Sequence, residues 1–138
     1  MILAIPYNEI TRYLSSHFGQ KVKLSYISGN EVEAVYSHKF LLVNINIKVE
    51  ITVESVKSTT IVLGYEGNKA VELALSKGLE FVKSRNPALL NGLKVDSSNH
   101  KITIDLSKIP QMKNILTYLK LQDIVASEKA LHISFTLK

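Results

Sequence analysis

An uninterrupted alternation of apolar and polar residues runs through the middle of the chain. From Val43 to Val53 every odd position is Val or Ile, and every even position is Asn, Lys, Glu or Thr. This period of two places one face of a β-strand on a core and the other face in water, as in an antiparallel sheet. We expect a strand from Phe40 to Glu54, whose alternating part alone measures roughly 35–40 Å at ~3.3 Å per residue. A strand about twice the usual length must bend or twist to cover a compact core.

Shorter patterns on either side predict the other elements of a single α+β domain that spans residues 1–138. Alternating stretches predict strands, helical periodicity predicts helices, and Gly, Pro and Asn mark the turns between them. Leu93 and Val95 are compatible with the start of a further strand, and Lys120 to Val125 with a short strand or a connector. The expected order is α-β-β-β-β-α-β-α-β, with elements at 6–18, 21–26, 32–36, 40–54, 59–65, 69–85, 102–106, 107–119 and 131–137.

The predicted helix at 69–85 has an unusually broad apolar surface. One stripe at helical spacing carries Val71, Leu75, Leu79 and Val82. Leu73 and Phe81 lie well off that stripe, so the helix needs cover on more than one side. We therefore expect a long, strongly curved antiparallel sheet that wraps around this helix. Gly78 inside the helix costs up to ~1 kcal/mol relative to alanine, which is tolerable if a neighbouring element must approach closely there.

Residue types that carry catalysis or bind metals are absent or poorly spaced. The chain has no cysteine, and its four histidines show no metal-ligand spacing. It contains no nucleophile motif and no phosphate-binding loop. Glu50 and Glu54 are best explained as residues on the solvent-facing side of a sheet. Asp105 and His100 fall on the polar side of their strand. We expect no enzyme activity, no metal and no cofactor.

The net charge of +5 comes from residues 69–138, since the first half of the chain is neutral. A basic half attracts nucleic acid, anionic lipid headgroups or acidic partners, and a solubilising lysine coat explains the same charge. The lysines are scattered, and Arg12 and Arg85 are the only arginines, so we expect no nucleic-acid binding. The expected partners are a lipid or an apolar small molecule and an anionic membrane surface. The oligomeric state is left open.

The N-terminal sequence MILAIPYNE lacks the basic region and the apolar length of a signal peptide. No apolar run approaches the ~20 residues of a membrane-spanning helix. The expected compartment therefore depends on whether a leader has been removed. It is the cell envelope or periplasm in that case, and the cytoplasm otherwise.

Three segments near the C-terminus share a layout with a group of lipid-binding proteins. They are a strand and a K-I-P helix from Ile102 to Pro110, an L-x-D-I stretch that ends at Ile124, and a closing strand from Leu131 to Phe135. In this layout the chain resembles bacterial members of the tubular lipid-binding (TULIP-like) superfamily and their lipoprotein relatives. The resemblance implies a curved sheet around a helix, an apolar groove and no catalytic residues. The chain departs from lipoprotein members in lacking their N-terminal lipobox cysteine.

Two functions fit these patterns. The first is non-enzymatic binding of a lipid or another elongated apolar ligand in a groove between the curved sheet and the helix. The alternative is a protein-interaction or structural module whose apolar surface forms an oligomer or partner interface, with Leu89 and Leu90 in the contact. The predicted apolar lining comprises Val43, Ile45, Ile47, Val49, Ile51, Val71, Leu75, Leu79, Val82, Leu89 and Leu90.

Overall fold

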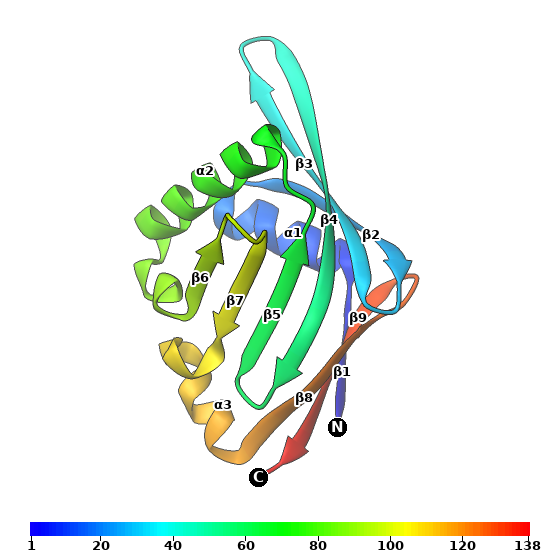
Figure 1. Ribbon diagram of the computed structural model, residues 1–138, viewed down its shortest axis with the longest axis vertical. Helices are drawn as coiled ribbons and strands as arrows, with labels where there is room; N and C mark the ends of the chain where they lie inside the picture. Colours follow the sequence, from blue (N-terminus) through cyan, green and yellow to red (C-terminus); the bar gives the residue numbers. More distant parts are fainter.

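The computed structural model describes residues 1–138, with the side chain of Phe40 excepted. Its strands are β1 (Ile2–Pro6), β2 (Lys21–Ser28), β3 (Glu31–Phe40), β4 (Val43–Lys57), β5 (Thr60–Tyr65), β6 (Leu93–Asp96), β7 (Lys101–Asp105), β8 (Leu119–Ala126) and β9 (Ala130–Leu137). Its helices are α1 (Tyr7–Phe18), α2 (Lys69–Arg85) and α3 (Lys113–Tyr118), with 3-10 turns η1 (Pro87–Gly92), η2 (Leu106–Lys108) and η3 (Pro110–Met112). The strands form a six-stranded antiparallel sheet, β2-β3-β4-β5-β7-β6, and a three-stranded antiparallel sheet, β1-β9-β8 (Figure 1). The predicted α+β class with antiparallel sheets is thus confirmed.

The predicted order of elements omitted three strands, β1, β6 and β8, and the structure corrects it. β1 shows no alternation of polar and apolar residues, and it is a strand because its backbone pairs with β9 at the other end of the chain, from Ile2–Ser134 to Pro6–Ala130. β6 has four residues and pairs with β7. Strands this short, or with partners this distant, leave little local trace in a sequence.

The long central strand begins later than predicted. Phe40 is the last residue of β3, the chain reverses at Leu41 and Leu42, and β4 starts at Val43. The Asn-Gly or Asp-Gly pairs that usually announce a two-residue hairpin turn are absent there. Leu41 nevertheless has a φ of 56°, in the left-handed region that favours glycine. The β3–β4 hairpin projects beyond the rest of the molecule, at the top of Figure 1.

The strand register divides the six-stranded sheet into an apolar face and a polar face, because paired residues point to the same side. One apolar row crosses four strands, with the pairs Val53–Leu63, Leu63–Ile102 and Ile102–Val95. Among the described side chains none falls below 2 % exposure, so the core is thin. The buried apolar side chains are Tyr7, Ala34, Ile61, Tyr65, Val71, Ile109, Leu116, Leu121, Ala126 and Ala130.

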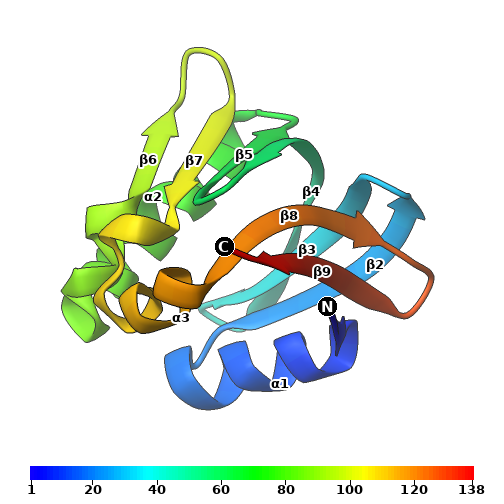
Figure 2. The ribbon, with the colours of Figure 1, turned by 90° about the horizontal axis from the view of Figure 1, so that it is seen from below.

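The three-stranded sheet joins the larger sheet through the two ends of β8. The buried Leu121 forms a bridge with Ser58, just after β4. At the other end, the Ala126 N–H donates to the carbonyl of Gly29 in the β2–β3 turn, at 2.8 Å. In Figure 2 the three-stranded sheet lies between α1 and the β4–β5 part of the larger sheet. α1 and the small sheet therefore share one side of the molecule.

Helix α2 begins as its sequence predicts and is only lightly covered. The Asn68 side chain caps it by accepting a hydrogen bond from the Val71 N–H at 3.0 Å, and Val71 is its one buried residue. Phe81 meets Phe18 of α1 edge-to-face, with ring centroids 6.4 Å apart. Apart from the backbone of the helix itself, no atom lies within 4 Å of the position that a Cβ of Gly78 would take, so no neighbouring element packs closely there. The wrapping of the sheet around α2 stays a prediction.

Candidate functional site

A groove with an apolar floor runs between α2 and the outer strand β6. Its volume is about 450 Å³. Leu79 comes from α2, Leu90 from η1, and Leu93 and Val95 from β6. The polar residues of its lining, Ser76, Glu80 and Lys83, all belong to α2. The groove therefore offers apolar contact below and polar or charged groups along one rim.

The chain builds this groove from three consecutive segments. Pro87 ends the helical run after α2 and opens η1, which turns the chain back toward the sheet. Leu93 and Val95 are two residues apart in β6, so both point to the same face. They pair with Ile104 and Ile102 of β7 and extend the apolar face of the sheet to its edge. No strand follows β6 in the sheet order, so the groove lies at an edge of the large sheet.

The structure brings together only part of the predicted lining. Leu79 and Leu90 line the groove, and Leu75, Val82 and Leu89 are half-buried on the same helix and turn. Val71 is buried and lies outside the groove lining. The residues Ile47, Val49 and Ile51 are half-buried on β4, which lies three strands away from β6 in the sheet order.

Val43 and Ile45 depart furthest from the predicted lining. Both are exposed and sit on the projecting part of the β3–β4 hairpin rather than opposite α2. In contrast, Leu93 and Val95 complete the floor and were not predicted to do so. Their alternation in a short stretch after η1 was the available signal, but the sequence does not say that this strand lies beside α2.

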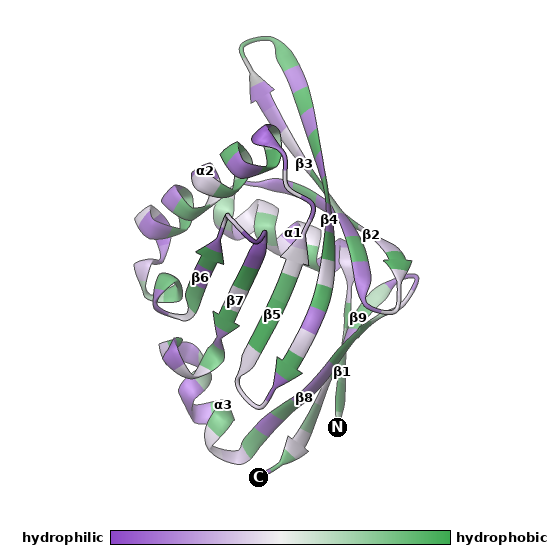
Figure 3. Ribbon diagram, viewed as in Figure 1, coloured by the Kyte–Doolittle hydropathy of each residue, from purple (hydrophilic) through white to green (hydrophobic). Residues whose placement is uncertain are grey.

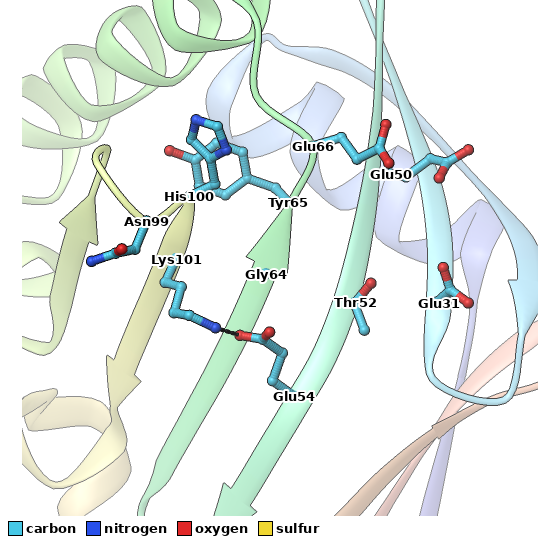
Figure 4. Close-up of a pocket in the computed structure, with 10 residues that line it drawn as sticks. All are labelled: Glu31, Glu50, Thr52, Glu54, Gly64, Tyr65, Glu66, Asn99, His100 and Lys101. Atoms are coloured by element: carbon cyan, nitrogen blue, oxygen red, sulfur yellow. Dashed lines mark hydrogen bonds and ion pairs between the residues drawn. The ribbon is translucent and has the colours of Figure 1, made fainter.

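A second, polar pocket of about 280 Å³ lies on the opposite, polar face of the large sheet, near the start of α2 (Figure 4). Lys101 forms an ion pair with Glu54 across Gly64, whose missing side chain leaves room for the Glu54 carboxylate at 3.0 Å from an ideal Cβ position. Glu31 and Glu50 also face this pocket, from β3 and β4. Within the part of the chain that the structure describes, no three His, Cys, Asp or Glu side chains gather closely enough to hold a metal ion.

Tyr65, Glu72 and His100 form a small polar cluster at the end of this pocket. The Tyr65 hydroxyl donates to Glu72 Oε1 at 3.0 Å, and His100 Nε2 lies 3.9 Å from the same oxygen. Burial, and then the hydrogen bond with Glu72, raise the pKa of the Tyr65 phenol. His100 also packs over Gly67, where a Cβ would stand 2.6 Å from its Nε2. The cluster links the first turn of α2 to the β6–β7 turn, which is a structural role.

Two aspartates with lowered pKa values are also explained by local structure. The Asn99 side chain donates to Asp96 Oδ2 at 2.8 Å, and this hydrogen bond lowers the pKa of Asp96. The Ser107 hydroxyl donates to Asp105 Oδ1 at 2.6 Å and lowers the pKa of Asp105, whose side chain also caps η2. Both carboxylates stabilise turns, in agreement with the structural role expected for Asp105.

Among the described residues, no helix has the length and the apolar character needed to cross a membrane. Comparison with protein-family models, with curated proteins and with solved structures found no match to this chain.

Proposed function

We propose that this chain binds a lipid or another elongated apolar molecule, without transforming it, in the groove between α2 and β6. The observation that carries the proposal is the floor of Leu79, Leu90, Leu93 and Val95 at the open edge of the large sheet. Its volume of about 450 Å³ lies within the range of small-molecule sites, roughly 300–1,000 Å³. The layout shared with TULIP-like proteins points to the same class of ligand.

The chemistry of the groove favours an amphiphile over a fully apolar ligand. Burial of each methylene against the leucine floor contributes about 0.8 kcal/mol. Lys83 stands at the rim and offers a cation to an anionic headgroup. Glu80, one helical turn away, disfavours a second negative charge beside the first. A single-chain carboxylate such as a fatty acid satisfies both conditions.

The test fills the groove from its rim. Ser76 is exposed and lines the groove, while Lys77 is exposed, next in sequence and outside the lining. Ser76→Phe therefore places a ring over the floor, and Lys77→Phe adds the same ring elsewhere on α2. A dansyl-labelled fatty acid should bind the natural chain with a blue shift in emission. Ser76→Phe should weaken that binding at least about tenfold, and Lys77→Phe should leave it unchanged.

Equal binding by all three proteins would show that any ligand sits elsewhere, and absence of binding by the natural chain would overturn the proposal. Native mass spectrometry of gently purified protein gives an independent measurement. A co-purifying adduct of a few hundred daltons that is lost in Ser76→Phe would support the groove as its site.

A second candidate function is an interaction module, and one observation favours it. β1 forms an edge of the three-stranded sheet and carries the exposed side chains Ile2 and Leu3. Edge strands with apolar side chains invite pairing with another chain. Sedimentation velocity at tens of micromolar tests this, because Ile2→Lys should dissociate any oligomer formed through that edge. Leu89 and Leu90, the contact first expected, are half-buried, and Leu90 belongs to the groove floor, so they are less available to a partner.

A further inference from the structure

We infer that the β3–β4 hairpin is a membrane-docking element, whose tip inserts into the interfacial layer of an anionic lipid bilayer while lysines behind it contact the headgroups. The inference goes beyond ligand binding in the α2–β6 groove and rests on none of its residues. It is carried by three observations on the hairpin. They are the apolar tip, the backbone of its turn and the distribution of charge along its polar face.

The tip exposes more apolar side chain than any other turn of the described chain. Leu41 is 82 % exposed, Leu42 is 93 % exposed, and Val43 beside them is 63 % exposed. Figure 3 shows hydrophobic residues at the end of the hairpin, beyond the body of the molecule. A cluster of this kind is costly in water and marks an interaction surface.

The turn itself is poorly suited to an aqueous loop. It has two residues, and Leu41 adopts a φ of 56°, where asparagine or glycine is the usual choice. Leucine is unfavourable at this position for two reasons. Its branched side chain disfavours the positive φ, and its apolar surface is exposed to water. Residues held in a backbone conformation that they disfavour, with no packing interaction to compensate, are concentrated at functional sites.

Charge along the polar face of the hairpin is segregated. The row nearest the tip pairs Lys39 with Asn44, the next aligns Lys21, Ser37 and Asn46, and the third aligns Lys23, Val35 and Lys48. These rows hold four exposed lysines and no carboxylate. The next row brings Glu33 opposite Glu50, so the acidic residues begin further from the tip. A group of lysines behind an apolar tip matches an anionic bilayer, because a negatively charged surface attracts lysines that lie close to it.

The hairpin also has the reach for such a contact. β2 pairs with β3 only as far as Ser37, and β5 pairs with β4 only from Ile51 onward. Residues 38–45 thus form a free two-stranded extension, roughly 13 Å long at ~3.3 Å per residue. Interfacial elements bury apolar groups to a depth of roughly 5–10 Å. Leucines at the tip can reach that depth while Lys39 and Lys21 stay at headgroup level.

The shape favours a bilayer over a protein partner. A stable protein interface buries roughly 800 Å² on each side, which a two-residue point on a narrow hairpin does not offer. A bilayer, in contrast, accepts a small apolar insertion and adds electrostatic attraction over the whole headgroup layer. Self-association through the tips is the competing outcome of the test.

The chain has no tryptophan, which makes a direct measurement possible. Leu42→Trp keeps the tip apolar and places a single fluorophore there, and Leu73→Trp on the exposed side of α2 is the matched control. Vesicles of phosphatidylcholine with about a third phosphatidylserine should shift the emission of the tip tryptophan to the blue, and brominated lipids should quench it. The α2 tryptophan should show neither effect.

Co-sedimentation with the same vesicles tests the residues themselves. Leu41→Asn/Leu42→Ser replaces the tip with residues that suit the turn, so the fold is not impaired, and binding should fall at least about tenfold. Lys39→Gln/Lys48→Gln should weaken binding to anionic vesicles and reduce its salt dependence, while Lys77→Gln/Lys120→Gln should have little effect. Ser76→Phe should bind vesicles like the natural chain, which separates this inference from the proposed groove.

Vesicle binding that survives Leu41→Asn/Leu42→Ser would overturn the inference, as would an α2 tryptophan that inserts equally. It would also be overturned by a chain that ignores vesicles and forms dimers that Leu41→Asn/Leu42→Ser dissociates. Insertion of the tip tryptophan together with loss of binding in that variant would establish it.

Discussion

The two ends of β4 follow one alternating pattern and have opposite surroundings. Near the tip, Val43 and Ile45 are exposed on a two-stranded extension. Toward the other end, Ile51 and Val53 are half-buried in rows that continue through β5. The same residue types are therefore surface at one end and core at the other. The comparison shows that alternation fixes which face is apolar, while neighbouring strands determine whether that face is covered.

Backbone conformation sharpens the contrast between these two regions. In the body, Gly92 is buried where a Cβ would stand 2.5 Å from the Asp105 carbonyl oxygen, so close packing requires glycine. At the tip, Leu41 adopts a glycine-like φ although it is exposed. Gly92 is thus the residue type that close packing in the body requires. Leu41 is required neither by packing nor by the backbone conformation at the tip.

The largest expected effect is a difference in stability between truncation of a buried isoleucine and truncation of an exposed one. Ile61→Ala on β5 removes a buried side chain and should lower the free energy of unfolding by about 2–4 kcal/mol. Ile45→Ala on the free part of β4 should change it by less than about 0.5 kcal/mol. Urea unfolding followed by circular dichroism measures both. Similar losses for the two variants would mean that the tip is covered in solution.

Two glycines test close packing in the same way. Gly92→Ala should cost about 1–3 kcal/mol, because the new methyl group meets backbone and Ile109 Cγ1 at 2.7 Å. Gly78→Ala should instead raise stability by about 0.5–1 kcal/mol, because no atom lies nearby and alanine favours the helix. The free energies of unfolding of the two variants should thus move in opposite directions. A destabilising Gly78→Ala would point to a neighbour that packs on α2.

Relief of the turn at the tip should give a smaller gain. Leu41→Asn places a residue that tolerates the left-handed region at the exposed turn, and it should raise the free energy of unfolding by about 0.5–1 kcal/mol. Denaturant unfolding in the absence of lipid is the measurement. A loss of stability would show that the Leu41 side chain makes contacts that hold the fold together.

The smallest expected effect is the pH dependence of the stability that Asp105 contributes. The hydrogen bond from Ser107 lowers the native pKa of Asp105 below its ordinary value of 3.8, so the carboxylate stabilises the fold above that pH. This contribution disappears as the pH falls through the lowered pKa. Asp105→Asn should therefore lower the Tm slightly at pH 7, and the difference should shrink as the pH falls below 3.8. A difference that persists in acid would mean that packing, and not charge, is responsible.

Much of the fold followed from local pattern. Helix α1 lies within one residue of its predicted bounds, and α2 matches the prediction at both ends, because helical periodicity and the Asn68 cap are local features. The alternation around Ile47 also predicted a half-exposed antiparallel strand correctly. β1 was missed, since its conformation depends on pairing with β9 more than a hundred residues away.

The candidate groove was only half predictable. The periodicity of α2 placed Leu79 on an apolar stripe, but nothing in the sequence said which strand would lie beside it. The predicted partner was β4, which α2 does contact, but the groove itself is lined by Leu93 and Val95 of β6. That choice depends on the sheet order β4-β5-β7-β6, which is set by long-range backbone pairing and not by residue pattern.

The sequence by itself determined the class of the fold, the apolar face of β4 and the absence of thiol chemistry, because periodicity and composition act residue by residue. Only the tertiary structure decided where the chain turns at Leu41 and Leu42, and that the apolar face of β4 ends in an uncovered tip. The physical reason is that the exposure of a side chain depends on which other elements of the fold pack against it. A leucine has the same local pattern whether another strand covers it or water surrounds it.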